Sequence, residues 1–318
     1  MENLLQIRDL KKYFTTRKGK VHAVDGVTMD IPRCSTMGIV GESGCGKSTL
    51  GRVLVHLEKA TDGEIRFNGK NVTRMNGKDL HEYRKHAQII YQDPYSSLNP
   101  RYTVDETIRE ALLMSGGCSR SEIEERTVHL MDLVGIAKRQ RKAYPHEMDG
   151  GRRQRVGIAR ALAFEPDFIV CDEPVSALDV SVQAQILNLL KELQMEKKVT
   201  YMFITHDLSV VRHISDSISV MYLGQLVETS PAKELFQKQY HPYTKALLSA
   251  VPSINIHRKS ERIILRGEIT SPIDPKPGCR FAARCNYACE ACHQPQELRE
   301  IAPGRFVACC RAEEFVAE

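Results

Sequence analysis

The feature that most constrains the fold is a glycine-rich segment, GESGCGKST, at residues 41–49. It matches the phosphate-binding pattern G-x-x-x-x-G-K-[ST] in full. Gly41, Gly44 and Gly46 allow the backbone to curl until its amides point inward at phosphate oxygens. Lys47 can then reach the β- and γ-phosphates of a nucleotide, and the Ser48 hydroxyl can ligate Mg²⁺. Apolar residues at helical spacing follow, so the loop is predicted to open onto a helix N-terminus, which favours anions.

A second segment, FIVCDEP, follows at residues 168–174. Its four apolar residues, 168–171, predict a buried strand of a parallel sheet. Asp172 and Glu173 stand at the end of that strand, where ligand sites of open α/β sheets lie. Asp172 suits the Mg²⁺ shell, and Glu173 suits polarising an attacking water. Together with the phosphate loop, the acidic pair predicts a site that hydrolyses nucleoside triphosphates.

Composition limits the other possibilities. The chain has 318 residues, 42% of them hydrophobic, and a net charge of +5, which argues little for a nucleic-acid partner. No apolar stretch approaches the ~18 residues needed to span a bilayer, and no signal peptide is recognised. We therefore expect a cytoplasmic chain unless a partner brings it to a membrane. The basic run at 138–142, KRQRK, is interpreted either as a contact for anionic lipid or a partner, or as a solvated helix end.

Strand and helix patterns alternate along the chain. Strands are predicted at 4–10, 21–31, 36–41, 62–69, 87–92, 168–171, 200–205 and 218–222. The stretch from about 103 to 164 is predicted to be wholly helical, with apolar stripes at Ile108, Ala111, Leu112 and at Ile123, Val128, Met131, Leu133. The fold class is therefore α/β: a mainly parallel core of P-loop type with an inserted helical subdomain at about 102–164.

Five further elements, in order, resemble the ATP-binding subunit of ATP-binding-cassette (ABC) transporters. They are Tyr13, Gln92, MDGGRRQR at 148–155, SALD at 176–179 and His206. The resemblance implies that Tyr13 stacks on adenine, that Gln92 senses Mg²⁺ and the attacking water, and that His206 contacts the γ-phosphate. Taken alone, Tyr13 suits the core and His206 suits a helix cap equally well.

The resemblance also implies a set of site residues. The catalytic group is Glu173, His206 and Gln92, and the Mg²⁺ ligands are Ser48, Gln92 and Asp172. The ATP contacts are Tyr13, Gly41, Ser43, Gly44, Cys45, Gly46, Lys47, Ser48, Thr49, Asp149, Gly150, Gly151 and Asp179. The domains implied are a nucleotide-binding domain at 1–251, whose N-terminal strands are antiparallel, and a cysteine-rich extension at 252–318.

Three segments narrow the resemblance to the oligopeptide/dipeptide branch of importers, which includes nickel importers. They are QDPYSSLNPR at 92–101, HPYTKALLSAVP at 241–252 and GCRFAARC at 278–285. This branch implies a peripheral protein at the cytoplasmic face of the membrane. Two related ATPase chains pair there beneath two membrane subunits, and an extracytoplasmic binding protein delivers the solute. A nickel-complex importer, a soluble non-transport ABC ATPase and a metal-sensing module are the alternatives.

One position departs from the family pattern: Asp149 stands where a serine is usual, and Arg152 where glutamine is common. In such dimers this segment completes the ATP site on the partner's phosphate loop. Two unit charges ~4 Å apart at an effective dielectric near 20 repel by about 4 kcal/mol, so Asp149 disfavours the γ-phosphate. Arg152 or Arg153 could offset part of that repulsion. We hypothesise an asymmetric heterodimer in which the site completed by Asp149 is weak, the alternative being that both sites are active.

Six of the ten cysteines lie between residues 279 and 310. Cys279, Cys285, Cys292 and Cys309 match the tail of the peptide-importer branch, where some members carry a [4Fe-4S] cluster. These four do not have C-x-x-C spacing, so zinc is less expected, and free thiols are the third possibility. Two further cysteines, at 289 and 310, fall outside this pattern.

One more cysteine, Cys45, lies inside the phosphate loop near Lys47. A helix N-terminus and a lysine both favour a thiolate, so we expect the pKa of Cys45 to be lowered. Alkylation of Cys45 is then expected to block ATP binding, and Mg-ATP to protect.

Overall fold

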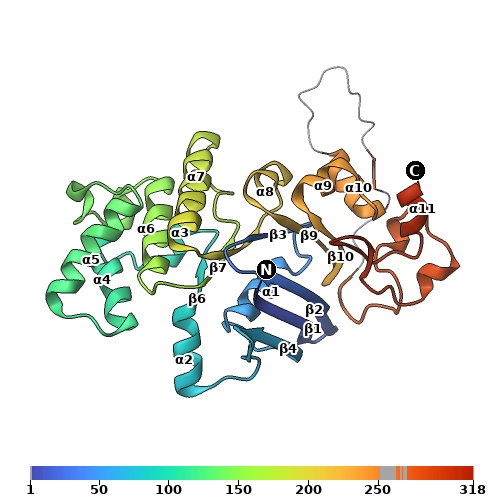
Figure 1. Ribbon diagram of the computed structural model, residues 1–318, viewed down its shortest axis with the longest axis horizontal. Helices are drawn as coiled ribbons and strands as arrows, with labels where there is room; N and C mark the ends of the chain where they lie inside the picture. Colours follow the sequence, from blue (N-terminus) through green and yellow to red (C-terminus); the bar gives the residue numbers. More distant parts are fainter. Residues whose placement is uncertain (1, 251–262, 266, 268–270, 318) are drawn as a thin grey trace. The chain divides into compact units, whose positions relative to one another are not determined.

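The structure, a computed structural model, describes residues 2–250, 263–265, 267 and 271–317 (Figure 1). It divides into two compact units. Unit 1 takes in residues 1–32, 36–74 and 205–318, and unit 2 takes in 33–35 and 75–204. The predicted boundary between 251 and 252 falls outside the described residues, as does the end of the 241–252 segment, so the domain division stays a prediction.

Unit 1 begins with an antiparallel sheet. Its strands are β1 (Asn3–Thr16), β2 (Gly19–Pro32), β4 (Asp62–Phe67) and β5 (Lys70–Asn71), in the order β2-β1-β4-β5. β1 and β2 are longer than predicted because a short turn at residues 17–18 lets them pair to their ends. The antiparallel N-terminal strands expected from the sequence are confirmed.

A second group of strands in unit 1 leads to the phosphate loop. β3 (Thr36–Val40) runs parallel to β9 (Ser217–Tyr222). β10 (Gln225–Pro231), β12 (Arg305–Val307) and β11 (Arg299–Ala302) continue outward from β9 with antiparallel pairing. The sequence analysis did not predict these last three, because β11 and β12 are too short to show an alternating pattern and β10 carries few apolar residues.

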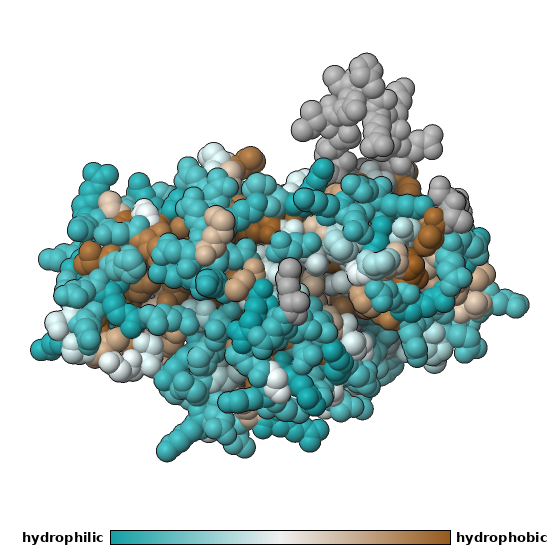
Figure 2. Space-filling view, in the orientation of Figure 1, coloured by the Kyte–Doolittle hydropathy of each residue, from teal (hydrophilic) through white to brown (hydrophobic). Residues whose placement is uncertain are grey.

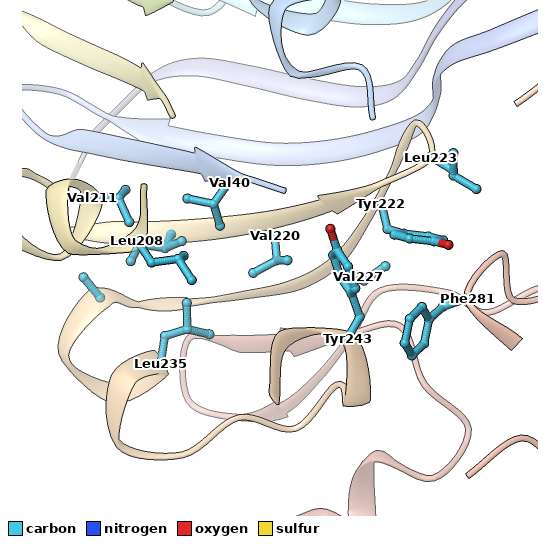
Figure 3. Packing of buried hydrophobic residues seen from close by; sticks show 12 residues of the cluster. Val40, Leu208, Val211, Val220, Tyr222, Leu223, Val227, Leu235, Tyr243 and Phe281 are labelled. Carbon is cyan, nitrogen blue, oxygen red and sulfur yellow. The ribbon is translucent and has the colours of Figure 1, made fainter. Parts of the chain in front are cut away.

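The helices of unit 1 are α1 (Lys47–Leu54), α8 (Leu208–Ile214), α9 (Ala232–Gln237), α10 (Pro242–Ser249) and α11 (Ala312–Ala317), with 3₁₀ turns η3 (Ala282–Arg284) and η4 (Glu290–His293). A core of apolar residues is formed by β9, β10 and the helices α8, α9 and α10 (Figure 3). Phe281, from the cysteine-rich region, enters this core and meets the rings of Tyr222 and Tyr243, each with a centroid distance of 5.4 Å. The cysteine-rich region is thereby packed into the same core as the strand β9.

Unit 2 contains three parallel strands in the order β6-β7-β8. They are β6 (Ala87–Ile90), β7 (Phe168–Asp172) and β8 (Thr200–Ile204). Its helices are α2 (Gly77–His86), α3 (Pro94–Ser97), α4 (Val104–Ser115), α5 (Arg120–Leu133), α6 (Gly150–Leu162) and α7 (Val180–Lys197). β7 and β8 are buried throughout, which explains their continuous apolar sequence.

Helices α4, α5 and α6 contact one another and form the predicted helical region (Figure 1). Capping boxes start α4 at Thr103 and α5 at Ser119. The predicted stripe of α4 is buried, whereas in α5 only the first and third members of the stripe, Ile123 and Met131, are buried. The prediction that residues 134–149 are helical is wrong. They form turns, which include the 3₁₀ turns η1 (Lys138–Gln140) and η2 (Pro145–Glu147).

One residue of the basic run at 138–142 forms ion pairs within unit 2. The Arg141 guanidinium donates to the Asp105 carboxylate at 2.6 Å and also pairs with Glu124. The remaining cations of the run lie at the η1 turn, mostly exposed. The ion pairs of Arg141 remove one cation from the run, and both interpretations stay open for the exposed ones.

Polar residues cover most of the face of the molecule shown in Figure 2, with apolar residues in separate small areas. Within the part of the chain that the structure describes, no helix combines the length and the apolarity needed to cross a membrane.

His241 is a buried titratable group at the start of α10. It is 1% exposed, and its Nδ1 accepts a hydrogen bond from the Tyr243 amide at 3.1 Å, so the neutral imidazole caps the helix. Burial lowers the pKa of His241 to about 3. The protein must therefore keep His241 neutral at pH values where the unfolded chain would protonate it.

We predict that lowering the pH from 7.5 to 5.5 reduces the free energy of unfolding by about 1.4 kcal/mol through this residue, because only the unfolded state gains the proton. His241→Asn keeps a capping oxygen but cannot titrate, so its pH dependence should be weaker by that amount. Urea unfolding of both proteins at the two pH values measures the difference. Equal pH dependence in the two proteins would contradict the assignment.

Candidate functional site

The phosphate loop of unit 1 has the conformation that its glycines predict. β3 is buried along its whole length and ends at the loop, and α1 begins at Lys47. Gly44 and Gly46 have φ angles of 76° and 108°, a region that favours glycine. A Cβ at Gly46 would also stand 1.9 Å from the Ala23 carbonyl oxygen, so the loop approaches β2 too closely for any side chain there.

Lys47 is buried at the base of the loop, with 5% of its surface exposed. Its Nζ donates to the carbonyl oxygens of Gly41 at 2.9 Å and Glu42 at 3.0 Å. Of the other predicted contacts, Ser43 is exposed, whereas Ser48 and Thr49 are half-buried in the first turn of α1. A cation held beneath curled backbone amides at a helix N-terminus is an arrangement that binds phosphate.

The expected lowering of the Cys45 pKa is wrong. The side chain is 3% exposed, and burial raises the pKa of its thiol despite the opposing charge of Lys47, whose Nζ is 3.9 Å from the sulfur. Lys47 donates its hydrogen bonds to the loop carbonyls, and the desolvation of the Cys45 thiol has a larger effect on its pKa than the charge of the lysine.

Residues distant in the sequence hold Glu42, the second residue of the loop. Its amide donates to the Tyr243 hydroxyl at 2.9 Å, and its carboxylate accepts from the Arg284 guanidinium at 2.9 Å. Arg284 is 9% exposed and the Glu42 side chain 23%, so this ion pair is partly shielded from solvent. The sequence analysis missed both partners because nothing in the local pattern at 243 or 284 points back to the loop.

Tyr13 belongs to a second network of unit 1. Its ring stacks on His22, with centroids 4.0 Å apart, and its hydroxyl donates to Asp25. Asp25 also contacts His22 at 3.0 Å and pairs with Arg280 of the cysteine-rich region. Burial opposes ionisation of Asp25, but the hydrogen bonds from Tyr13 and His22 and the charge of Arg280 keep its pKa below the ordinary value. Tyr13 is thus fixed in orientation, and its contact with adenine stays a prediction.

In unit 2, the structure brings two of the predicted catalytic residues together at the end of β7. Gln92 Nε2 donates to Glu173 Oε2 at 3.0 Å. Asp172 is 4% exposed as the last residue of the strand. Glu173 has a φ of 48°, which is strained for a residue with a side chain, and its amide donates to the Ile204 carbonyl at 2.9 Å. This backbone turns the chain sharply away from the strand directly after Asp172.

Asp149 caps helix α6. Its Oδ1 accepts from the Arg152 amide at 2.8 Å, and its Oδ2 lies 3.3 Å from Arg152 Nε. Gly151 is tightly packed, because a Cβ there would stand 2.5 Å from a methyl group of Val182. Asp179 caps α7 in the same way, accepting from the Val182 amide at 3.0 Å. Both aspartates therefore have a folding role, whatever their role toward nucleotide.

The remaining predicted site residue, His206, lies in unit 1 directly after Thr205 and is exposed. The next residue, Asp207, and not His206, caps helix α8 by accepting from the Ser209 amide at 2.8 Å. The helix-cap interpretation of His206 is therefore wrong, and its contact with the γ-phosphate stays a prediction.

The C-terminal cysteines gather in unit 1, where the members of the predicted quartet, Cys279, Cys285, Cys292 and Cys309, lie near enough to act electrostatically on one another. Among the described residues, the cysteines whose sulfurs all lie close together are Cys289, Cys292 and Cys310. Only Cys292 belongs to the predicted iron–sulfur quartet. A [4Fe-4S] cluster takes four thiolates, one for each of four irons, so the three close sulfurs alone do not ligate one, and the cluster at the quartet stays a prediction. The signal for this set was present in the sequence, because Cys289 and Cys292 have C-x-x-C spacing.

Comparison with known proteins identifies the class. The family model described as "ABC transporter" matches residues 24–176, and the one described as "Oligopeptide/dipeptide transporter, C-terminal region" matches residues 227–292. Solved structures with the same fold include cbiO1 of Clostridium perfringens, part of an ABC transporter complex, with a TM-score of 0.67 and 28% identity over 75% of this chain and 92% of that one. The ATP-binding cassette MJ0796 in a dimeric post-hydrolysis state gives a TM-score of 0.65 and 27% identity over 72% and 98%.

The chain belongs to the ABC transporter family. Along nearly its whole length it is similar to oligopeptide transport ATP-binding proteins of Bacillus subtilis. It is 50% identical to the putative protein YkfD, over 96% of this chain and 94% of that one, and 49% identical to OppF, over 98% of each. The predicted P-loop α/β fold and the resemblance to the peptide-importer branch are confirmed.

The buried state of Cys45 predicts low reactivity. At pH 7, iodoacetamide should modify Cys45 more slowly than the exposed Cys34 by on the order of tenfold or more, since both access and thiolate fraction are reduced. Mass spectrometry of the two peptides over time gives both rates in one sample. Faster labelling of Cys45 than of Cys34 would contradict this prediction and support an activated thiol at Cys45.

Proposed function

We propose that this chain is the ATP-binding and ATP-hydrolysing subunit of a peptide importer. The observation that carries the proposal is the complete phosphate loop, with Lys47 buried beneath its amides and α1 opening behind it. The similarity to oligopeptide transport ATP-binding proteins supports peptides as the solute class. Mg²⁺, held by Ser48, Asp172 and Gln92, would neutralise charge on the phosphate oxygens.

Glu173 is the residue proposed to orient the attacking water. The proposal is supported by its place at the carboxyl end of a parallel strand and by the hydrogen bond that its carboxylate accepts from the Gln92 amide. Lys47 takes up charge that develops on the phosphates, and His206 supports the γ-phosphate. ATP binding is proposed to join this chain to a second, related ATPase chain and to move two membrane subunits, while hydrolysis releases the pair. The chain would then act at the cytoplasmic face of the membrane as a peripheral subunit.

A pull-down from gently solubilised native membranes tests this assembly. A tagged chain is expected to recover a second related ATPase and two polytopic membrane proteins, together with Mg-dependent ATPase activity. Recovery of a soluble homodimer that hydrolyses ATP without membrane partners would argue for a non-transport ATPase.

Replacement of the water-orienting carboxylate tests the chemistry. Glu173→Gln should bind ATP with unchanged affinity but hydrolyse it about 10²–10⁴-fold more slowly, because the amide cannot accept a proton. Glu192→Gln, on the exposed surface of α7, is the matched control and should leave the rate unchanged. The measurement is phosphate release from the reconstituted complex. A normal rate in Glu173→Gln would exclude this residue as the base.

We further propose that the two ATP sites of the complex differ. The carboxylate of Asp149 would face the partner's γ-phosphate, and only part of its charge is offset by Arg152 at 3.3 Å, because both side chains are at least half exposed. Arg153, the other predicted cation, instead donates to the Pro145 carbonyl at 2.7 Å. The site built from this chain's own phosphate loop would be the active one, given a serine-type signature on the partner.

Single-turnover hydrolysis in the reconstituted complex measures the difference. The wild-type complex should show one fast site per dimer, and Asp149→Ser should convert the slow site to a fast one. Asp149→Asn keeps the helix cap while removing the charge, so a gain in that variant assigns the effect to electrostatics. Two equally fast sites in the wild-type complex would refute the asymmetry.

A further inference from the structure

The cysteine-rich region contains an equilateral set of sulfurs formed by Cys289, Cys292 and Cys310. The Sγ–Sγ distances are 3.9 Å for 289–292, 3.8 Å for 289–310 and 3.8 Å for 292–310. All three residues are free cysteines. For a tetrahedral ion with Zn–S bonds of ~2.3 Å, neighbouring ligand sulfurs stand about 3.8 Å apart. The three sulfurs therefore already have the spacing of ligands to one ion.

The local fold explains this spacing. Cys289 and Cys292 flank the first residues of η4, and the Cys292 amide donates to the Cys289 carbonyl at 3.0 Å, which brings both side chains to the same side of one turn. Cys310 follows β12, whose pairing with β10 and β11 fixes where the chain returns. Two separate segments thus present one bidentate C-x-x-C unit and one further thiol, as in mononuclear thiolate sites.

The surroundings provide access and charge balance. A pocket of about 700 Å³ is lined by Cys289, Cys292 and His293, so an ion has a path to the sulfurs from solvent. Three thiolates and a divalent ion carry a net charge of −1, and the Arg311 guanidinium acts electrostatically on Cys289. Cys292 is buried and Cys289 is exposed, so the site lies at the edge of the protein.

We propose that Cys289, Cys292 and Cys310 bind a single soft d¹⁰ cation of the Zn²⁺ type, with the fourth tetrahedral position open to a small ligand from the pocket. The site joins η4 to the segment after β12 and acts as a staple for a region with little apolar core of its own. Because Cys292 is shared with the quartet predicted to hold a [4Fe-4S] cluster, the two sites exclude one another. The inference depends on the sulfur geometry and not on the proposed transport function.

Metal analysis of four matched serine variants separates the two sites. The full-length chain is purified anaerobically with a reductant, and Zn²⁺ and Fe are measured per chain, with Co²⁺ as an optical probe of thiolate ligation. The wild type should bind about one Zn²⁺ per chain. Cys289→Ser and Cys310→Ser should each weaken Zn²⁺ binding by more than about a hundredfold, beyond the loss typical of outer-shell changes. Cys279→Ser and Cys309→Ser should keep the metal.

The opposite pattern overturns the proposal. A brown, iron-containing protein that loses its iron in Cys279→Ser and Cys309→Ser, but not in Cys289→Ser and Cys310→Ser, would assign the cysteines to the iron–sulfur quartet. Absence of any bound metal in the reduced wild type would also overturn it. ATP affinity, measured in parallel on every variant, shows whether each one is folded and keeps this test independent of the ATPase proposal.

Discussion

The phosphate loop depends on contacts made to Glu42 from the far end of the chain. Its amide and its carboxylate are held by Tyr243 and Arg284, and both of these residues adjoin the aromatic core around Phe281. A glycine-rich loop has high conformational entropy, so fixing one of its non-glycine residues by two partly buried contacts restricts the loop more than its own sequence can. Other elements of unit 1, including β9, α10 and η3, are arranged around this connection.

Much of the site was predictable because it is local in sequence. The phosphate loop, the strand β7 and the acidic pair after it are short patterns whose residues are neighbours in the chain, and each lies where its pattern predicted. Glu173 was predicted from this local pattern and Gln92 from the family resemblance, and the hydrogen bond between them was not predicted. The apolar stripe of α4 was also predictable from local sequence, because the spacing of residues alone determines which of them share one face of a helix.

The parts that were not predicted depend on contacts between distant residues. The pKa of Cys45 was assigned the wrong direction because the sequence shows its neighbour Lys47 but not its burial. The buried face of α5 includes Thr127 and Leu130 rather than Val128, because packing against α4 and α6 determines which face of the helix is buried. The closely spaced set of Cys289, Cys292 and Cys310 was not predicted, because it depends on where β12 returns the chain to η4.

The sequence separation of these contacts has a consequence for biosynthesis. Glu42 is translated before Arg284, which is 242 residues further along the chain. Domains generally fold as units while the chain emerges from its N-terminus. The nascent phosphate loop therefore lacks this restraint until translation has passed residue 284, and a chain truncated before that residue carries every residue of the loop without it. Synthesis of the loop and completion of its restraints are thus separate events, divided by the synthesis of more than two hundred residues.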